Sequence, residues 1–339
     1  MQLGWLRYGL LVQLIIMLAS CGWSQAEHAE QNPVGNSKTA AQLLGDSNYL
    51  AICYGGYRTN SRDSQPNIAQ IKDDLKILHA MGVKLLRTYN THYAEAANVL
   101  KAIQELQTED TTFEMYVMLG VWIDCENAWT NTTPNHEREN VQANSAEIAR
   151  AVKLVNQYPQ LVKMISVGNE AMVKWATSYY VTPTIVLKWV NHLQQLKQQN
   201  KLPQDVWITS SDNFASWGGG DSSYHVNDLT KLYRAVDFVS IHTYPMHDTH
   251  YNPVFWKLSG YEKQWRKEVQ VDTLLHRSVA YAQAQYASVV QYMKSIGVNK
   301  PIHIGETGWA SSSDGYYGKA GSAACDEYKS AKYYQLIRD

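Results

Sequence analysis

The segment PIHIGETGWAS, residues 301–311, is a short apolar run that stops at an acidic residue, Glu306. A second segment, ISVGNE at residues 165–170, has the same form, because apolar residues and a glycine lead directly into Glu170. Side chains at the carboxyl ends of parallel strands meet at one edge of a barrel. The two segments therefore predict two strands that bring two carboxylates to a common site.

Seven apolar stretches of this kind alternate with longer helical patterns from residue 49 onward, which is typical of a parallel α/β fold. The stretches are almost continuously apolar, as strands buried on both faces are. The predicted strands are residues 49–54, 84–89, 114–122, 162–167, 205–210, 236–242 and 300–305, and the clearest predicted helices are residues 66–81, 140–158, 182–199 and 271–296.

Two folds fit this alternation, a (β/α)8 barrel and an open doubly wound sheet. A dinucleotide-binding sheet requires a G-x-G-x-x-G turn after an early strand, whereas the first strand here is followed by Gly55, Gly56, Tyr57 and Arg58. The barrel is favoured. Only seven β-then-α units are present, and a last helix begins near Ala323. We therefore expect a barrel over residues 49–339 whose eighth strand is missing, in a chain that is incomplete at its C-terminus.

The overall composition limits the possible partners. Lys plus Arg total 30 and Asp plus Glu total 31, so no basic face is expected for a nucleic acid. The chain has 23 Tyr and 11 Trp but only 4 Phe. Rings with a polar group suit amphipathic ligands such as sugars, although they are equally compatible with ordinary half-buried positions.

The N-terminus resembles a secretory signal. Arg7 precedes an apolar run at residues 10–19, which is shorter than the roughly 20 residues of a membrane-spanning helix. The run ends in LASC, which resembles a bacterial lipobox with Cys21 as the lipidated residue. We expect a signal peptide at residues 1–21, a flexible tether at residues 22–48 and a location in the cell envelope, on the periplasmic or exterior side. Cys53, Cys125 and Cys325 remain, and the sequence leaves open both one disulfide and none.

Two glutamates at one barrel mouth have the residue types that glycoside hydrolysis requires. One carboxyl group protonates the leaving oxygen while the other attacks the anomeric carbon, and a retaining enzyme holds them about 5–5.5 Å apart. Their environments must differ, so that one stays protonated and the other stays ionised. A solvated carboxylate at a loop start would explain either glutamate alone, but it explains the matched pair poorly.

The motifs GNE at residues 168–170 and ETGWAS at residues 306–311 resemble the two signatures of glycoside hydrolase family 17, a family of (β/α)8 retaining glycosidases. Segments CYG at 53–55, LRTY at 86–89 and VMLGV at 117–121 resemble its first three strands. The resemblance covers roughly residues 49–339. It implies that Glu170 is the acid/base, that Glu306 is the nucleophile and that the substrate is a β-1,3-glucan.

The same resemblance implies roles for neighbouring residues. Asn169 is expected to bond the sugar 2-hydroxyl, although it could simply cap a turn, and Arg87 to keep Glu306 ionised. Tyr244 is expected to contact the nucleophile. The other predicted substrate-binding residues are Tyr54, Tyr89, His242, Trp217 and Trp309, each of which could instead serve packing.

The loop after the sixth strand, HTYPMHDTHYNPVFW at residues 242–256, contains three histidines. Its spacing matches no usual metal site, so we expect a cleft rim, and neither a metal nor another cofactor. The leading hypothesis is a monomeric, membrane-anchored retaining β-1,3-glucan hydrolase. The alternatives are a transglycosylase with the same residues and a glycan-binding lipoprotein without turnover.

Overall fold

The computed structural model describes residues 37–248, 258–312 and 325–338. The predicted signal peptide, Cys21 and most of the predicted tether lie outside these residues, as does His250 of the loop after the sixth strand. In the described part of the chain, no helix is both long and apolar enough to cross a membrane.

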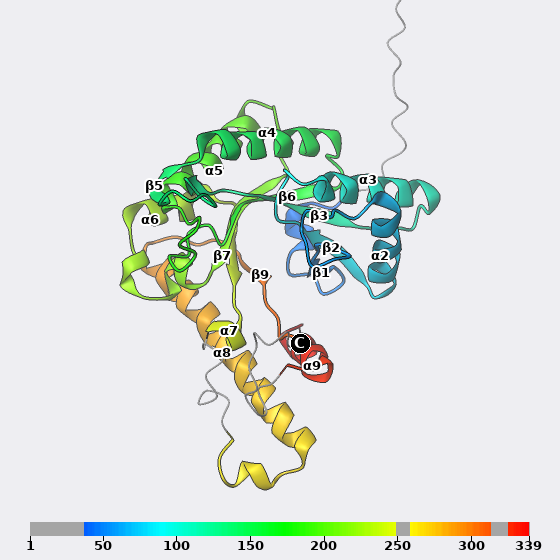
Figure 1. Cartoon of the computed structure of the whole chain (residues 1–339), viewed down its shortest axis with the longest axis vertical. Coiled ribbons are helices and arrows are strands. Elements are labelled where there is room, and N and C mark those ends of the chain that lie inside the picture. Colours follow the sequence, from blue (N-terminus) through cyan, green and yellow to red (C-terminus); the bar gives the residue numbers. More distant parts are fainter. Residues whose placement is uncertain (1–36, 249–257, 313–324, 339) are drawn as a thin grey trace, which may run out of the picture. The chain divides into compact units, whose positions relative to one another are not determined.

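Seven parallel strands form one sheet that curves into a nearly closed barrel (Figure 1). The middle strands carry the core: all six residues of β3 are buried, as expected for a parallel strand covered on both faces. The predicted strands and their order are confirmed. In sheet order they are β1 (Leu50–Cys53), β2 (Val83–Arg87), β3 (Tyr116–Val121), β6 (Val162–Asn169), β7 (Trp207–Asn213), β8 (Val239–His242) and β9 (Ile302–Glu306).

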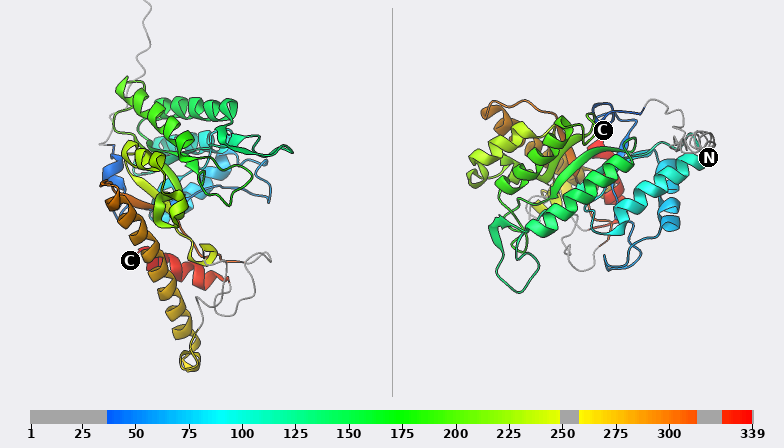
Figure 2. Two further views of the ribbon diagram at one scale, coloured as in Figure 1. Left: turned by 90° about the vertical axis from the view of Figure 1, so that its left-hand side faces the viewer. Right: turned by 90° about the horizontal axis from the view of Figure 1, so that it is seen from above.

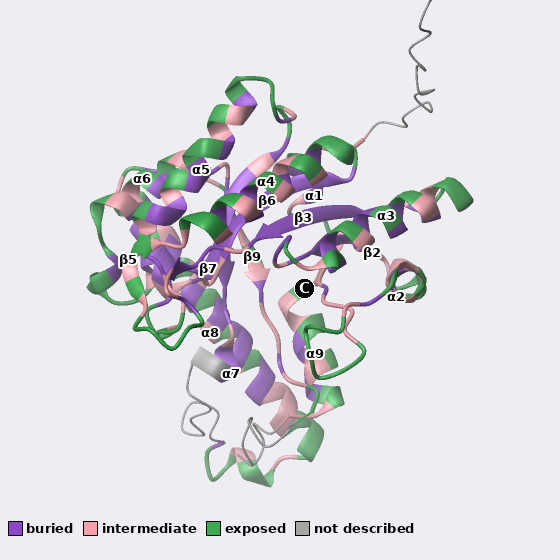
Figure 3. Ribbon diagram, turned by 45° about the horizontal axis from the view of Figure 1, so that its top comes forward, coloured by how far each residue is buried: buried purple, intermediate pink, exposed green. Residues whose placement is uncertain are grey.

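Helices follow most of the strands and turn their exposed faces away from the buried strands (Figure 3). The first long helix shows how local sequence sets a boundary, because the Asn67 side chain accepts from the Gln70 amide and the Gln70 side chain accepts from the Asn67 amide. The four predicted helices are confirmed, and α3 and α6 fall outside them. The helices are α2 (Ile68–Ala80), α3 (Ala94–Glu109), α4 (Val141–Gln157), α5 (Pro183–Gln198), α6 (Asn227–Ala235), α7 (Pro245–Asp248), α8 (Lys267–Ser295) and α9 (Glu327–Arg338), with short turns η1 (Ala215–Gly219), η2 (Ser222–Tyr224) and η3 (Glu262–Gln264).

The barrel has an open seam, defined here as the gap between β1 and β9, which are the two edges of the sheet. A pocket of about 360 Å³ lies there, lined by residues of β1, β9 and α9. Tyr334 of α9 donates a hydrogen bond to the Ala51 carbonyl of β1 over 3.5 Å. Figure 2 shows α9 beside the long helix α8, and the two share an apolar cluster. The described residues thus contain seven barrel strands, and α9 covers part of the seam.

The predicted tether is wrong at its C-terminal end. Helix α1 (Ala40–Leu43) lies within it, and both Ala40 and Leu43 are buried. They pack in a cluster with side chains of β2, β3, β6 and the segment before β8, so they form part of the buried core of the barrel. A helix of four residues is too short to show periodicity in the sequence, which is why the segment resembles a linker.

A two-stranded hairpin, β4 (Cys125–Glu126) and β5 (Asn135–Glu139), is inserted between β3 and α4. It is tied to the segment that follows β6, because the Cys125 amide donates to the Tyr179 carbonyl over 3.1 Å and the Thr182 amide donates to the His136 carbonyl over 3.2 Å. No disulfide joins Cys53, Cys125 and Cys325 to one another.

Candidate active site

The carboxyl ends of four strands meet at the candidate active site. Arg87 is the last residue of β2, His242 the last of β8 and Glu306 the last of β9, while Glu170 directly follows β6. His242 and Glu306 are register partners across β8 and β9. Parallel pairing therefore places these side chains at one mouth, as the two matching sequence segments predict.

Glu306 lies in the more enclosed and more positive of the two carboxylate environments. It is 9% exposed, forms an ion pair with Nη1 of Arg87 and accepts a hydrogen bond from the Tyr244 hydroxyl over 2.8 Å. Burial alone raises the pKa of Glu306, but His242, Arg87 and Tyr244 together outweigh burial and lower the pKa below its ordinary value. This carboxylate is therefore held ionised.

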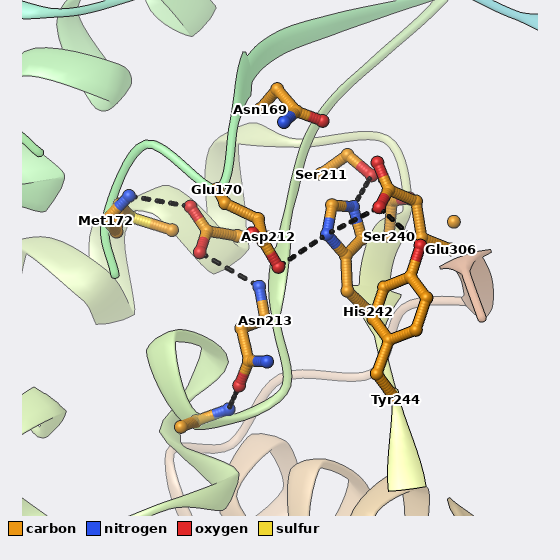
Figure 4. A network of polar contacts seen from close by, with 12 residues as sticks. Asn169, Glu170, Met172, Ser211, Asp212, Asn213, Ser240, His242, Tyr244 and Glu306 are labelled. Carbon is orange, nitrogen blue, oxygen red and sulfur yellow. Dashed lines mark hydrogen bonds and ion pairs between the residues drawn. The ribbon is translucent and has the colours of Figure 1, made fainter. Parts of the chain in front are cut away.

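Glu170 lies in a more open position, with a quarter of its side chain exposed. Its backbone φ is +46°, in the left-handed region that a residue with a side chain seldom adopts. The conformation is held because the Glu170 amide donates to the Ser211 carbonyl over 3.0 Å. The turn aims the carboxylate at the imidazole of His242 (Figure 4), and backbone strain of this kind is common where a side chain must be aimed.

His242 connects the two carboxylates. Its Nδ1 lies 3.1 Å from Oε1 of Glu170 and 3.7 Å from Oε2 of Glu306. Since both distances start at one atom, the two oxygens are at most about 7 Å apart, which accommodates the separation of about 5–5.5 Å found in retaining glycosidases. His242 is expected to bind substrate, but in this structure it is fully buried behind the two carboxylates and does not line the cleft.

A row of hydroxyl groups supports the far side of the imidazole. Nε2 of His242 lies 2.7 Å from Oγ of Ser211, which in turn lies 2.8 Å from Oγ of Ser240 (Figure 4). Gly305 makes room for this row, because a Cβ there would come within 2.2 Å of the Ser240 hydroxyl and 2.5 Å of the Ser211 hydroxyl. A glycine immediately before Glu306 is therefore required by packing.

Arg87 also fixes Asn169. Nη2 of Arg87 donates to the Asn169 side-chain oxygen over 2.7 Å. The side-chain nitrogen of Asn169 is therefore turned away from Arg87. Tyr89, two residues after Arg87, packs its ring 5.1 Å from the guanidinium and is partly exposed. Arg87 thus orients two of the predicted site residues, and Tyr89 keeps a face open beside them.

A cleft of about 1210 Å³ runs from the two glutamates across the loops that follow β1, β2, β3 and β6. Its lining is aromatic and polar, a combination that suits sugars, whose hydroxyls need hydrogen-bond partners and whose C–H faces pack on rings. The lining includes Asn169, Glu170 and Glu306 together with Tyr57, Tyr89, His92, Tyr93, Trp122, Asp124, Trp129, Asn140, Glu147, Arg150 and Tyr179.

Three predicted sugar-contacting rings lie in the protein interior instead. Trp217 is fully buried and donates from its indole to the Ser240 carbonyl over 3.0 Å. Tyr54 is 6% exposed and donates to Asp74. Trp309 is 4% exposed and packs beside Tyr333 of α9. These side chains are enclosed by neighbouring helices, so in this structure none of the three predicted sugar platforms lines the cleft.

Several residues in or behind the site are missing from the sequence-based prediction. Ser211 and Asp212 end β7 in the run TSSDN, and such a run of polar residues after an apolar strand is the signal that could have found them. Trp122, Asp124 and Trp129 lie in and just before the β4–β5 hairpin, whose polar sequence gives no strand pattern. Among the residues that the structure describes, no group of three or more His, Cys, Asp or Glu side chains could hold a metal ion.

A (β/α) barrel with two facing glutamates in an aromatic cleft is the arrangement of a glycoside hydrolase. The chain belongs to the family of BtgE/BtgC glycoside hydrolase domains, whose model matches residues 51–337. This match confirms the class that the GNE and ETGW motifs predict.

Solved structures agree with this assignment. The chain is similar to an endo-laminarinase from Formosa Hel1_33_131, with 60% identity, a TM-score of 0.86 and coverage of 89% of this chain and 76% of that one. A β-1,3-glucanase of Cryptomeria japonica pollen (14% identity, TM-score 0.53, 85% and 82% coverage) and a plant β-glucan endohydrolase (18%, 0.50, 85% and 83%) share the fold. A comparison with curated protein sequences finds no match.

Proposed function

We propose that this chain is an endo-acting, retaining β-1,3-glucan hydrolase in which Glu306 is the nucleophile and Glu170 the acid/base. The observation that carries the proposal is the meeting of the two carboxylates at one nitrogen of His242, beside a cleft of about 1210 Å³ that both glutamates line. The similar structure with 60% identity is that of an endo-laminarinase, which supports the choice of substrate.

The environments of the two glutamates suit different roles. Arg87 and Tyr244 hold Glu306 ionised, so its free electron pair can attack the anomeric carbon and form a glycosyl ester. Glu170 gives its proton to the departing glycosidic oxygen in that step. It then takes a proton from the water that cleaves the ester, which regenerates both groups. The amide nitrogen of Asn169 is available to donate to the 2-hydroxyl beside the reacting carbon.

Two glutamine variants test the assignment. Glu306→Gln should lower laminarin hydrolysis by more than about 10³-fold, because no nucleophile remains. Glu170→Gln should lower it by about 10²–10⁴-fold, and by much less on an aryl glucoside whose leaving group needs no proton. Equal losses on both substrates would contradict the role of Glu170.

The stereochemical course gives an independent check. Proton NMR of the first products should show the β-anomer, because two displacements retain configuration. Initial release of the α-anomer would rule out a glycosyl ester on Glu306. Products longer than the substrate would instead indicate transfer to a sugar.

We also propose that Cys21 is lipid-modified and anchors the enzyme in the cell envelope. The support is the sequence alone, namely the apolar run at residues 10–19 followed by LASC. In cells that express the full chain, Cys21→Ser should abolish labelling by a fatty-acid analogue and move the protein from the membrane fraction to the soluble fraction. Membrane retention of the unlabelled variant would overturn the proposal.

A further inference from the structure

The hairpin inserted after β3 and the segments that flank it present three aromatic rings at the wall of the cleft. The rings of Trp129 and Tyr179 are stacked, with centroids 5.0 Å apart and an angle of 20° between their planes. Trp122 lies 5.2 Å from Tyr179 and 6.4 Å from Trp129. All three residues line the cleft that contains Glu170 and Glu306. They therefore form one continuous apolar surface in the space that the proposed substrate occupies.

The aromatic surface of Trp122, Trp129 and Tyr179 includes a ring that stays in contact with water, although burying it would stabilise the fold. Trp129 is 62% exposed, and a large ring left in water forgoes the stabilisation of burial. Its φ is +62° and that of Asn127 is +65°, so two residues of the hairpin turn hold left-handed conformations that cost energy in a residue with a side chain. The Trp129 amide donates to the Ser178 carbonyl over 3.3 Å, which fixes the turn to the segment after β6. The fold thus holds the ring in place rather than burying it.

A carboxyl group lies beside the rings. Asp124 lines the same cleft and is 6% exposed, and its Oδ1 has no hydrogen-bond partner among the described residues. Its backbone is fixed, because its amide donates to the Asn144 side-chain oxygen over 3.1 Å and the Asn144 side-chain nitrogen donates to its carbonyl over 3.0 Å. Burial raises the pKa of Asp124 to about 6, against the lowering effect of hydrogen bonds from Trp122 and Asn140. A buried oxygen without a partner is costly unless a ligand supplies one.

We propose that Trp122, Trp129 and Tyr179, together with Asp124, form a glucosyl-binding subsite away from the two catalytic glutamates. A pyranose ring packs its C–H face on the aromatic surface, and one of its hydroxyls donates to the Asp124 carboxyl. The inference rests on the proposed function. It adds that the enzyme gains affinity from a sugar unit remote from the bond it cleaves, so it selects long glucan chains.

The test measures binding in the Glu306→Gln background, where no hydrolysis takes place. Isothermal titration with linear β-1,3-gluco-oligosaccharides of increasing length gives the affinity of each. With Trp129 intact, affinity should rise at the length that reaches the subsite. Trp129→Ala should remove that rise, with about a tenfold loss for long oligosaccharides and none for the shortest. Trp129→Phe, which keeps a ring, should restore most of it.

Trp175 provides the matched control. It is 58% exposed and lies in the segment after β6 that also carries Tyr179, but it does not line the cleft. Trp175→Ala should leave every affinity unchanged. Asp124→Ala should weaken only the long oligosaccharides, while Asp124→Asn, which keeps an acceptor oxygen, should weaken them less. Melting temperatures identify any variant that loses binding through unfolding.

The outcomes separate this inference from the proposed function. If the Glu306→Gln protein binds no β-1,3-gluco-oligosaccharide of any length, the proposed substrate is wrong. If it binds them and the added Trp129→Ala substitution leaves the affinity for every length unchanged, the subsite is wrong and the proposed function stands. A loss that is the same for short and long oligosaccharides would also overturn the subsite.

Discussion

The imidazole Nδ1 of His242 lies 3.1 Å from the carboxylate of Glu170, although the residues are 72 positions apart in the chain. The ring is fully buried, and its other nitrogen, Nε2, bonds the Ser211 hydroxyl. An acceptor carboxylate on one side and a hydroxyl on the other favour a proton on Nδ1. His242 therefore acts as a fixed donor beneath the proposed acid/base.

Replacing His242 should impair catalysis more than substrate binding. His242→Gln should lower kcat by about 10²-fold, the typical effect of losing one preorganised donor at a reacting group, with KM little changed. Steady-state kinetics on laminarin measure both constants. Ser211→Ala is the control, since it leaves the Nδ1 contacts in place and should cost less. A larger loss from Ser211→Ala than from His242→Gln would contradict the role of Nδ1.

Tyr244→Phe should shift the acidic limb of the pH profile. The Tyr244 hydroxyl donates to Glu306 and helps to lower the pKa of that carboxyl. Without it, the pKa of Glu306 rises, so a larger fraction of the nucleophile is protonated and inactive at acidic pH. The apparent pKa of the acidic limb of kcat/KM, which reports the free enzyme, should move to higher pH. A limb that stays in place or moves to lower pH would rule out this contribution.

Asp212→Asn should change how stability depends on pH. Asp212 is fully buried at the end of β7 and accepts from the amides of Met172 and Asn213 (Figure 4). Burial raises its pKa to about 7. The folded state therefore holds the proton more tightly than the unfolded state, and this contribution is complete below the unfolded pKa of about 3.9 and lost as pH rises towards 7.

The asparagine variant lacks that titration. The free energy of unfolding of Asp212→Asn, relative to the parent protein, should therefore increase between pH 4 and pH 7, by a few kcal/mol at most at about 1.4 kcal/mol per pH unit. Urea unfolding at several pH values measures the difference. A relative stability that is constant or falls over this range would contradict the raised pKa.

Trp217→Ala should weaken the fold without weakening sugar binding. Trp217 packs edge-on against Tyr233, 4.8 Å away, in the main core. Removing a buried indole costs about 3–5 kcal/mol through lost contacts and the cavity that remains. Thermal unfolding should show a large decrease in melting temperature, whereas the affinity of the folded fraction for laminarin should stay within about twofold. A selective loss of affinity would restore the sugar-platform interpretation.

The sequence predicts the barrel well because its signals are local. Each buried strand is a continuous apolar run, and the helices that follow carry boundary signals such as Pro183 at the start of α5. The same locality predicts the site, since Glu170 and Glu306 stand at the ends of such runs. Register then brings them together without further information.

What the sequence misses depends on packing between distant segments. Trp217 follows a strand and precedes three glycines, which indicates an exposed loop, but Tyr233 of α6 and Tyr292 of α8 enclose that segment. Conversely, Trp129 lies in an unpatterned polar stretch, and only the pairing of β4 with β5 and the contact with Ser178 place it at the cleft. Patterns in a single sequence reveal regular periodicity, and the segments around Trp217 and Trp129 have no such periodicity.

The seam gives the Arg87–Glu306 ion pair a second consequence. Among the described strands, β9 pairs through its backbone with β8 and forms an edge of the sheet, so backbone pairing anchors the strand that carries Glu306 along one side. The guanidinium of Arg87 reaches Glu306 from β2, past β1, and ties the two ends of the sheet together. Neutralising either partner should therefore allow β9 to open locally more often. The amide hydrogens of β9 should then exchange faster with solvent. The ion pair that keeps the proposed nucleophile ionised thus also joins the two edges of the sheet.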